Sequence, residues 1–388
     1  MRLEAETGLD VGVLEAVLEC GQPEARIALA RQLAALIADP ETSLREREQV
    51  LPIMLKIATD TDRNVRRALA DELVTLETLN ADLVFAVIAD EDAIAIPFLS
   101  ATPALNPWHM LAILRVGDDA RQSSVARRAD LTVEAKSYIL KAGTLAAALA
   151  MLVNPAVKLL PVDLQQLYQR LGQSGEMVER LLARPDLPLD VRITQAKRAA
   201  VRMRQLMAER GWLPANDAAE LVADAEETAV LQVLSDAETQ ERLHATAFLA
   251  AQHMLTPSLI IRAACVGEMR VVATALAHLT GHAPGRVEEL IKSKGGNGIK
   301  SLINRSGLPL ASHVILTAAS QVMAELRSEG ISLDADGFGR RLLETLMMHS
   351  GALPHKEQVK QIDFIGRYGD EKVRKIARKL KADLLRAA

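Results

Sequence analysis

The chain has 388 residues, a formal net charge of −4, 49% hydrophobic residues and only 3% aromatic residues. The slightly negative charge excludes a general electrostatic attraction to nucleic acid or to anionic membranes, so any such binding needs a local basic patch. Because aromatic residues are scarce, an interior must consist of small aliphatic side chains, which suits closely packed helices.

The cysteines and the hydropathy pattern indicate where the chain resides. Cys20 and Cys265 lie far apart without metal-binding spacing, which favours reduced thiols in the cytoplasm. Residues 1–10 lack the apolar core of a secretory signal. The most apolar run, residues 142–153, is shorter than the roughly 20 residues of a membrane span. We therefore expect a soluble cytoplasmic protein with no transmembrane segment.

A repeat near the N-terminus organises the chain. Residues 24–33 and 64–73 match in register, Arg26 with Arg66, at a spacing of 40 residues. A repeat of this length with small and branched apolar residues at helical spacing is typical of stacked helix pairs, each burying its apolar face against the next. The recurring arginine suggests either a partner-binding position or a ladder of ion pairs to carboxylates of the neighbouring repeat.

The helices of the first half follow from periodicity and end signals. Ser43 with Glu46 three residues later predicts a capping box. We expect aspartates in the turns, among them Asp60, Asp62 and Asp90, to cap the helices that follow. The predicted helices are 9–19, 24–38, 43–59, 63–77 and 80–89.

Between residues 90 and 188 the repeats shorten. Three similar pieces end a short apolar helix with a polar residue and then turn at or near proline or aspartate. The polar residues are Arg128, Asn154 and Arg184, which stand 26 and 30 residues apart. These spacings predict truncated repeats of the same solenoid.

A longer helix over residues 190–210 ends at Gly211, and Asp217 is expected to cap the next helix. We place a domain boundary here, between a helical-repeat domain over residues 1–213 and a helical C-terminal domain over residues 214–388. The helices predicted after the boundary are 218–234, 239–253, 258–265, 271–279, 286–292, 299–305, 312–329, 340–348 and 371–386.

Several short motifs recur in the order seen in one known family. They include Ile96-Pro97-Phe98-Leu99, Asn154-Pro155, Arg184-Pro185-Asp186-Leu187-Pro188, residues 255–262 and Gly307-Leu308-Pro309. This order resembles the alphaproteobacterial domain-of-unknown-function proteins with HEAT-like repeats, over roughly residues 24–323. The resemblance implies an all-α fold, a HEAT-like α-solenoid of helical hairpins followed by a smaller helical C-terminal domain. It supplies no catalytic residues.

Two groups in the second half invite a chemical function. His278 and His282 stand four apart, but Gly281 between them favours a helix end over a metal pair. The loop over residues 293–298 is rich in glycine and includes Lys294, so it could hold a phosphate, although no Walker pattern or preceding strand accompanies it. No catalytic arrangement of serine, histidine or cysteine is evident, and we expect neither enzyme activity, metal nor cofactor.

The C-terminal end, residues 371–388, is a basic amphipathic helix. Seven lysines and arginines against two acidic residues give it a charge of +5. Such a helix could dock on the body or a second subunit, or bind an acidic partner, nucleic acid or a membrane. It lacks the aromatic residues that stack on bases, which favours docking with a solvated basic rim.

These features predict a non-catalytic scaffold or adaptor that binds other proteins through its helical-repeat surface. A homodimer is compatible with this prediction. The alternatives are nucleic-acid binding through the basic helix and the repeat arginines, and binding of a phosphorylated ligand at residues 293–298. The predicted partner-binding residues are Arg63, Arg67, Arg127, Lys372, Lys375 and Lys379.

Overall fold

A computed structural model describes residues 11–293, 296–332, 334–350, 359, 362, 366–368 and 371–387. All secondary structure in these ranges is helical, as predicted. The chain divides into two compact units, Met1–Leu187 and Pro188–Ala388, which we describe separately. No helix in the described ranges is both long and apolar enough to span a membrane.

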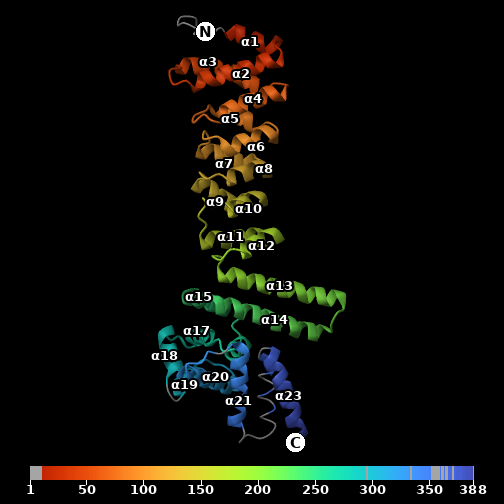
Figure 1. Cartoon of the computed structure of the whole chain (residues 1–388), viewed down its shortest axis with the longest axis vertical. Helices are drawn as coiled ribbons and strands as arrows, with labels where there is room; N and C mark the ends of the chain where they lie inside the picture. The colour runs from red at the N-terminus through yellow and green to blue at the C-terminus, as the bar shows by residue number, and fades with distance from the viewer. Residues whose placement is uncertain are drawn as a thin grey trace. The chain divides into compact units, whose positions relative to one another are not determined.

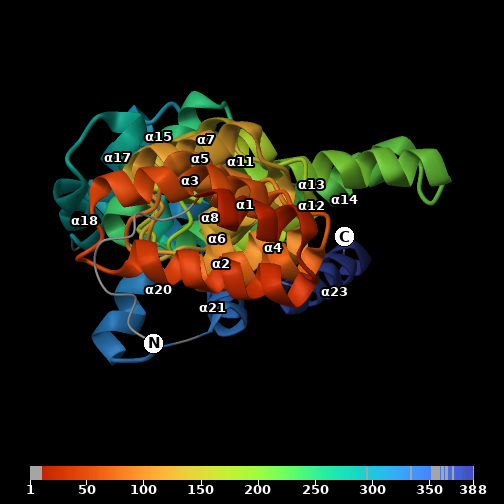
Figure 2. The same cartoon turned by 90° about the horizontal axis from the view of Figure 1, so that it is seen from above.

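The first unit is an α-solenoid of helical hairpins (Figure 1). Its helices are α1 (Val11–Cys20), α2 (Pro23–Ala38), α3 (Leu44–Ala58), α4 (Arg63–Leu73), α5 (Ala81–Ile88), α6 (Asp92–Ala101), α7 (Pro107–Val116), α8 (Asp119–Ala126), α9 (Val133–Ala142), α10 (Leu145–Leu152), α11 (Pro161–Leu171) and α12 (Gly175–Leu182). The even-numbered helices pack side by side as one layer, and the odd-numbered helices form the other. Figure 2 shows α3, α5 and α7 on one side and α2 and α4 on the other.

The repeats shorten along the unit, as the sequence predicted. Helices α2 and α3 have 16 and 15 residues, whereas α5, α8, α10 and α12 have eight each. The predicted capping box is confirmed: the Glu46 amide donates to Ser43 Oγ at 3.3 Å, and the Ser43 amide donates to Glu46 Oε2 at 2.9 Å. These bonds satisfy two amides of the first turn of α3 that have no partner within the helix.

The second unit surrounds a helix that is buried on every side. Its helices are α13 (Leu189–Arg210), α14 (Ala215–Asp236), α15 (Thr239–Ala251), α16 (Pro257–Cys265), α17 (Met269–Thr280), α18 (Pro284–Lys292), α19 (Asn297–Arg305), α20 (Leu310–Glu329), α21 (Ala335–Ser350) and α23 (Glu371–Ala387). Residues 259–265 of α16 are all buried, and α14, α17, α20 and α21 pack around this helix. Burial on all faces explains why α16 lacks the polar stripe of a surface helix.

The division between the units precedes the boundary expected at residue 213. Helix α13 packs closely along α14, so it belongs with the second unit. Gly211 ends α13 in the left-handed conformation, with φ of 62°, as a C-cap glycine does. Asp217 is not the cap of α14, as the sequence suggested; it lies in the first turn, because the helix already begins at Ala215.

Candidate functional site

The loops that lead from odd to even helices form one edge of the solenoid, here called the acidic edge. Arg26 pairs with Asp60 at 3.1 Å, and Arg66 donates to both carboxylate oxygens of Asp90 at 2.7 and 3.0 Å. Both arginines belong to the first turns of even helices and reach the next loop along the stack. The repeat arginine found in the sequence therefore forms an ion-pair ladder between hairpins.

The loops that lead from even to odd helices form the opposite edge. Here a side chain that follows α8, α10 or α12 donates to carbonyls at the end of the previous even helix. Arg128 donates to the carbonyls of Leu99 and Thr102 at 2.7 and 2.9 Å. Asn154 donates to those of Ala126 and Arg128 at 3.0 and 2.9 Å, and Arg184 to that of Leu152 at 3.1 Å. The three similar pieces of sequence are therefore equivalent caps on unpaired helix ends.

Helix direction alternates between the layers. Side-chain hydrogen bonds between the neighbouring odd helices α9 and α11 show which ends of the odd helices lie together. Lys136 in the first turn of α9 binds Asp163 in the first turn of α11 at 2.7 Å, so these N-termini are adjacent. Arg170 near the end of α11 donates to Ile139, Leu140 and Gly143 at the end of α9, at 2.8, 3.0 and 2.7 Å. The starts of the odd helices and the ends of the even helices therefore share one edge.

This second edge exposes large apolar side chains, and we call it the apolar edge. Its members lie at the starts of odd helices or at the end of α10. Between α7 and α11 they are Trp108, Val133, Val153, Leu160 and Val162, between 48% and 75% exposed, and Leu44 at the start of α3 is 73% exposed. The Trp108 ring meets Phe85 of α5 edge-on, with the ring centroids 5.4 Å apart, which fixes its orientation.

The predicted arginines of the first unit do not share one edge. Arg127 is the C-cap of α8 and lies on the apolar edge, where its side chain makes no hydrogen bond or ion pair with a described residue. Arg63 and Arg67 lie in the first two turns of α4, toward the acidic edge. Arg63 is paired with Glu91, whereas Arg67 is exposed.

The basic C-terminal helix is docked within the second unit. Val373 and Ala377 of α23 are buried in the core cluster, and Arg374 pairs with Asp224 at 2.9 Å. Lys375 and Lys379 are exposed, and the side chain of Lys372 lies outside the described residues. The helix therefore has a buried apolar stripe and a solvated basic rim, as the sequence favoured.

Asp224 is shared by two arginines. Arg262 of the buried helix α16 also contacts its carboxylate, and the Arg262 guanidinium lies 5.7 Å from the ring centroid of Tyr368. Burial alone would raise the pKa of Asp224, but the hydrogen bonds and charges of Arg262 and Arg374 outweigh it and lower that pKa. The carboxylate thus links α14, α16 and α23.

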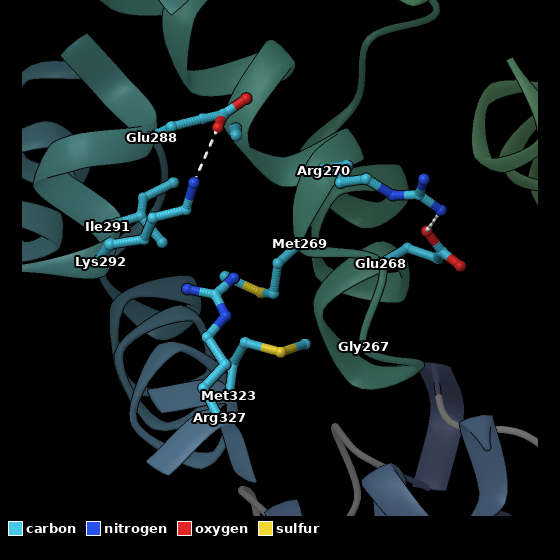
Figure 3. Close-up of a pocket in the computed structure, with 10 residues that line it drawn as sticks. Gly267, Glu268, Met269, Arg270, Glu288, Ile291, Lys292, Met323 and Arg327 are labelled. Atoms are coloured by element: carbon cyan, nitrogen blue, oxygen red, sulfur yellow. Dashed lines mark hydrogen bonds and ion pairs between the residues drawn. The ribbon is translucent and has the colours of Figure 1, made fainter. Parts of the chain in front are cut away.

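A cavity of about 440 Å³ lies between α17, α18 and α20 (Figure 3). Its lining residues are Gly267, Glu268, Met269, Arg270, Ala273, Glu288, Ile291, Lys292, Met323 and Arg327. Arg270 pairs with Glu268 at 3.7 Å and Lys292 with Glu288 at 3.0 Å. The Arg327 side chain makes no hydrogen bond or ion pair with a described residue.

A buried cation stands near this cavity. Arg242 of α15 is 4% exposed and donates to the carbonyls of Leu234 and Ala237. Burial lowers the pKa of Arg242, and the nearby positive charge of Arg270 lowers it further. The carboxylates Glu238, Glu268 and Glu288 act on the same guanidinium and partly oppose that lowering of its pKa.

The remaining sequence candidates do not form a site in the described residues. Gly281 ends α17 between His278 and His282 with φ of 67°, so the two histidines are not on one helix. No group of three His, Cys, Asp or Glu side chains in the described part could hold a metal ion. In the glycine-rich loop, Lys294 and Gly295 lie outside the described residues. Gly298 packs on the Leu290 carbonyl, where a Cβ would be 2.2 Å from the oxygen.

Comparison with protein families assigns the chain. The model described as "Uncharacterised protein conserved in bacteria (DUF2336)" matches residues 94–352, which is more than half of the chain. The chain belongs to the DUF2336 family. The DUF2336 region begins in α6, so it starts later than the expected resemblance from residue 24, and it ends after α21. It contains the apolar edge from Trp108 to Val162 and the cavity, but neither the first two hairpins nor α23. Curated proteins and solved structures give no significant match.

Sequence reasoning missed the apolar edge and the cavity for different reasons. A signal for the edge was present, because apolar residues stand at or beside helix starts where polar caps are usual, as at Trp108 and Val133. The cavity joins residues of three helices, and no local pattern connects Arg270 with Arg327. Only the packing of α17 against α18 and of α18 against α20 brings these side chains around one space.

Proposed function

We propose that this DUF2336 protein is a non-catalytic scaffold that binds another protein along the apolar edge of its solenoid. The observation that supports this proposal is the row of exposed apolar side chains at Trp108, Val133, Val153, Leu160 and Val162. Contiguous exposed apolar surface is typical of protein-binding sites, and tryptophan is prominent among residues that dominate binding energy.

The construction of the edge supports the same role. Arg128, Asn154 and Arg184 direct their polar groups inward, onto helix ends, so backbone carbonyls are satisfied without using the outer surface. The side chains outside them are therefore free to meet a partner. Arg127 adds an unpaired cation beside the apolar row, which suits a partner with an apolar face flanked by acidic residues.

We infer that the hairpin stack is of the HEAT-like kind, and the extended surfaces of such repeats commonly receive peptides or helices. We place the scaffold in the cytoplasm, where the buried free thiol of Cys265 would stay reduced. Nucleic-acid binding through α23 is less favoured, since that helix uses its apolar face and Arg374 to dock on the second unit.

Site-specific photocrosslinking in the producing cells tests the proposal. A photoreactive amino acid replaces Val133 at the start of α9 or, as a matched control, the exposed Lys141 in the last turn of the same helix. We expect a discrete protein adduct from position 133 and none from position 141. Adding Trp108→Ser should reduce the adduct. Equal crosslinking at both positions, or none at position 133, would contradict binding at this edge.

A further inference from the structure

We propose that the cavity between α17, α18 and α20 binds a small phosphate monoester whose organic part is apolar. This site belongs to the second unit and is independent of the apolar edge of the solenoid. Its volume of about 440 Å³ lies within the range of small-molecule sites, roughly 300–1,000 Å³. Its lining combines cations with an apolar wall, which is the pairing that such a ligand requires.

The cations of the lining come from three helices, and Figure 3 shows Lys292 and Arg327 facing one space while Arg270 points away from them toward Glu268. Arg270 is on α17, Lys292 on α18 and Arg327 on α20. The lining thus carries three cations against two carboxylates, Glu268 and Glu288, a net charge of +1. The excess of positive charge attracts an anion, and the planar guanidinium of Arg327 can donate two parallel hydrogen bonds to phosphate oxygens.

The two existing ion pairs do not prevent binding. The side chains of Arg270 and Glu268 are 68% and 30% exposed, and those of Lys292 and Glu288 are 55% and 49% exposed. Ion pairs at such positions contribute roughly 0–1 kcal/mol, so the cations can turn toward a ligand at little cost. Arg327 has no pair to break with a described residue.

The apolar wall selects the rest of the ligand. Met269, Ala273 and Ile291 are buried residues that nevertheless line the cavity, and Met323 faces it from α20. Figure 3 shows the thioethers of Met269 and Met323 next to the Arg327 side chain. Methionine side chains adapt their shape to apolar groups, so this wall suits an alkyl or other hydrocarbon body.

A phosphate fits the site better than a carboxylate does. The monoester is close to a dianion at neutral pH and offers three acceptor oxygens, enough to accept from both Arg327 and Lys292. A carboxylate carries one charge and would duplicate what Glu268 and Glu288 already supply.

Isothermal titration calorimetry with hexyl phosphate tests the site in the full-length chain. We expect saturable binding, weaker by at least about tenfold in Arg327→Gln, because a charge-assisted bidentate contact is lost. Arg305→Gln is the matched control, since Arg305 is an exposed arginine on α19 outside the cavity lining, and it should bind like the parent. Methyl phosphate should bind at least about tenfold more weakly than hexyl phosphate, because it lacks the buried alkyl chain.

Three results would overturn the proposal: no binding of hexyl phosphate at millimolar concentration, unchanged binding in Arg327→Gln, or heptanoate binding as tightly as hexyl phosphate. The last result would identify the site as one for carboxylates. Circular dichroism establishes that each variant is folded. Since Arg327 is exposed and unpaired among the described residues, its replacement should leave the fold intact.

Discussion

Replacing Asn154 with alanine should destabilise the solenoid although no apolar core residue changes. The Asn154 side chain is buried and makes three hydrogen bonds. It donates to the carbonyls of Ala126 and Arg128 and accepts a bond of 3.0 Å from the Ala156 amide. It therefore joins the end of α8 to the loop after α10, and its loss leaves two helix-end carbonyls without a protein partner.

The expected loss in the free energy of unfolding follows from these bonds. A hydrogen bond contributes about 1 kcal/mol net, so losing three should cost about 3 kcal/mol. Asn154→Asp should cost at least as much, because it retains the acceptor but turns a carboxylate toward two carbonyl oxygens. Urea unfolding followed by circular dichroism measures the loss, and hydrogen exchange should show faster exchange in α8 and α10.

The matched control is Asn304→Ala in the second unit. Asn304 is exposed and its side chain makes no hydrogen bond with a described residue, so the free energy of unfolding should change by less than about 0.5 kcal/mol. If Asn154→Ala changes stability no more than this control does, the capping of one helix end by the next hairpin does not hold the stack together.

Three further predictions concern the second unit. Burial raises the pKa of the Cys265 thiol to about 12. In a Cys20→Ser background the folded protein should therefore resist Ellman's reagent at pH 8 and react only after unfolding. Rapid labelling of the folded protein would contradict the burial of Cys265. The pKa of Asp224 is lowered from 3.8, so the ionised carboxylate contributes its full stabilisation above pH 3.8 and loses it as the pH falls through the folded-state pKa. The difference in the free energy of unfolding between the parent and Asp224→Asn should therefore shrink below pH 3.8. A difference that stays constant would refute the ion-pair account. Gly267 has φ of 85°, and a Cβ there would lie 2.9 Å from the Phe338 ring, so Gly267→Ala should lower the free energy of unfolding by about 1–3 kcal/mol. The control Gly285→Ala, at an open helical position, should change it by less than about 1 kcal/mol. Equal effects of the two substitutions would show that the close approach to Phe338 is unimportant.

The architecture of the solenoid was predictable because its signals are local. Helical periodicity and the Ser43 capping box act within a few residues, and the recurrence of Arg26 at Arg66 marks one structural unit stacked on another. The same holds for Arg128, Asn154 and Arg184. These three residues recur about once per hairpin in the sequence, since each caps the end of an even helix in the hairpin before it.

The partners of the acidic turn residues were harder to predict. Asp62 caps α4 as expected, with its carboxylate 2.8 Å from the Asn64 amide. Asp60 and Asp90 are not the N-cap residues, but each accepts the amide of the N-cap that follows, at 2.8 and 2.7 Å, and also pairs with Arg26 or Arg66. A short polar residue before a helix fits either role in the sequence. Asp60 and Asp90 fill both roles, because the stacking of hairpins also brings an arginine within reach of each carboxylate.

The candidate sites depended on packing between helices. The predicted residues Arg63, Arg67 and Arg127 share residue type, but Arg127 follows the end of an even helix whereas the other two stand at the start of one, so Arg127 lies on the opposite edge. The loop over residues 293–298 suggested phosphate binding by composition. The cavity that we assign to a phosphate lies beside Lys292, where that loop begins, and its other cations come from distant helices.

The most direct test of the central claim measures binding at the apolar edge with the partner identified by crosslinking at position 133. The affinity of the purified full-length chain for that protein is compared with that of Trp108→Ser/Val133→Ser and of the control Lys141→Ser. We predict at least about tenfold weaker binding for the double variant, because two exposed apolar anchors are lost, and no change for the control. Unchanged affinity in a folded double variant would contradict the assignment of this edge as the binding surface.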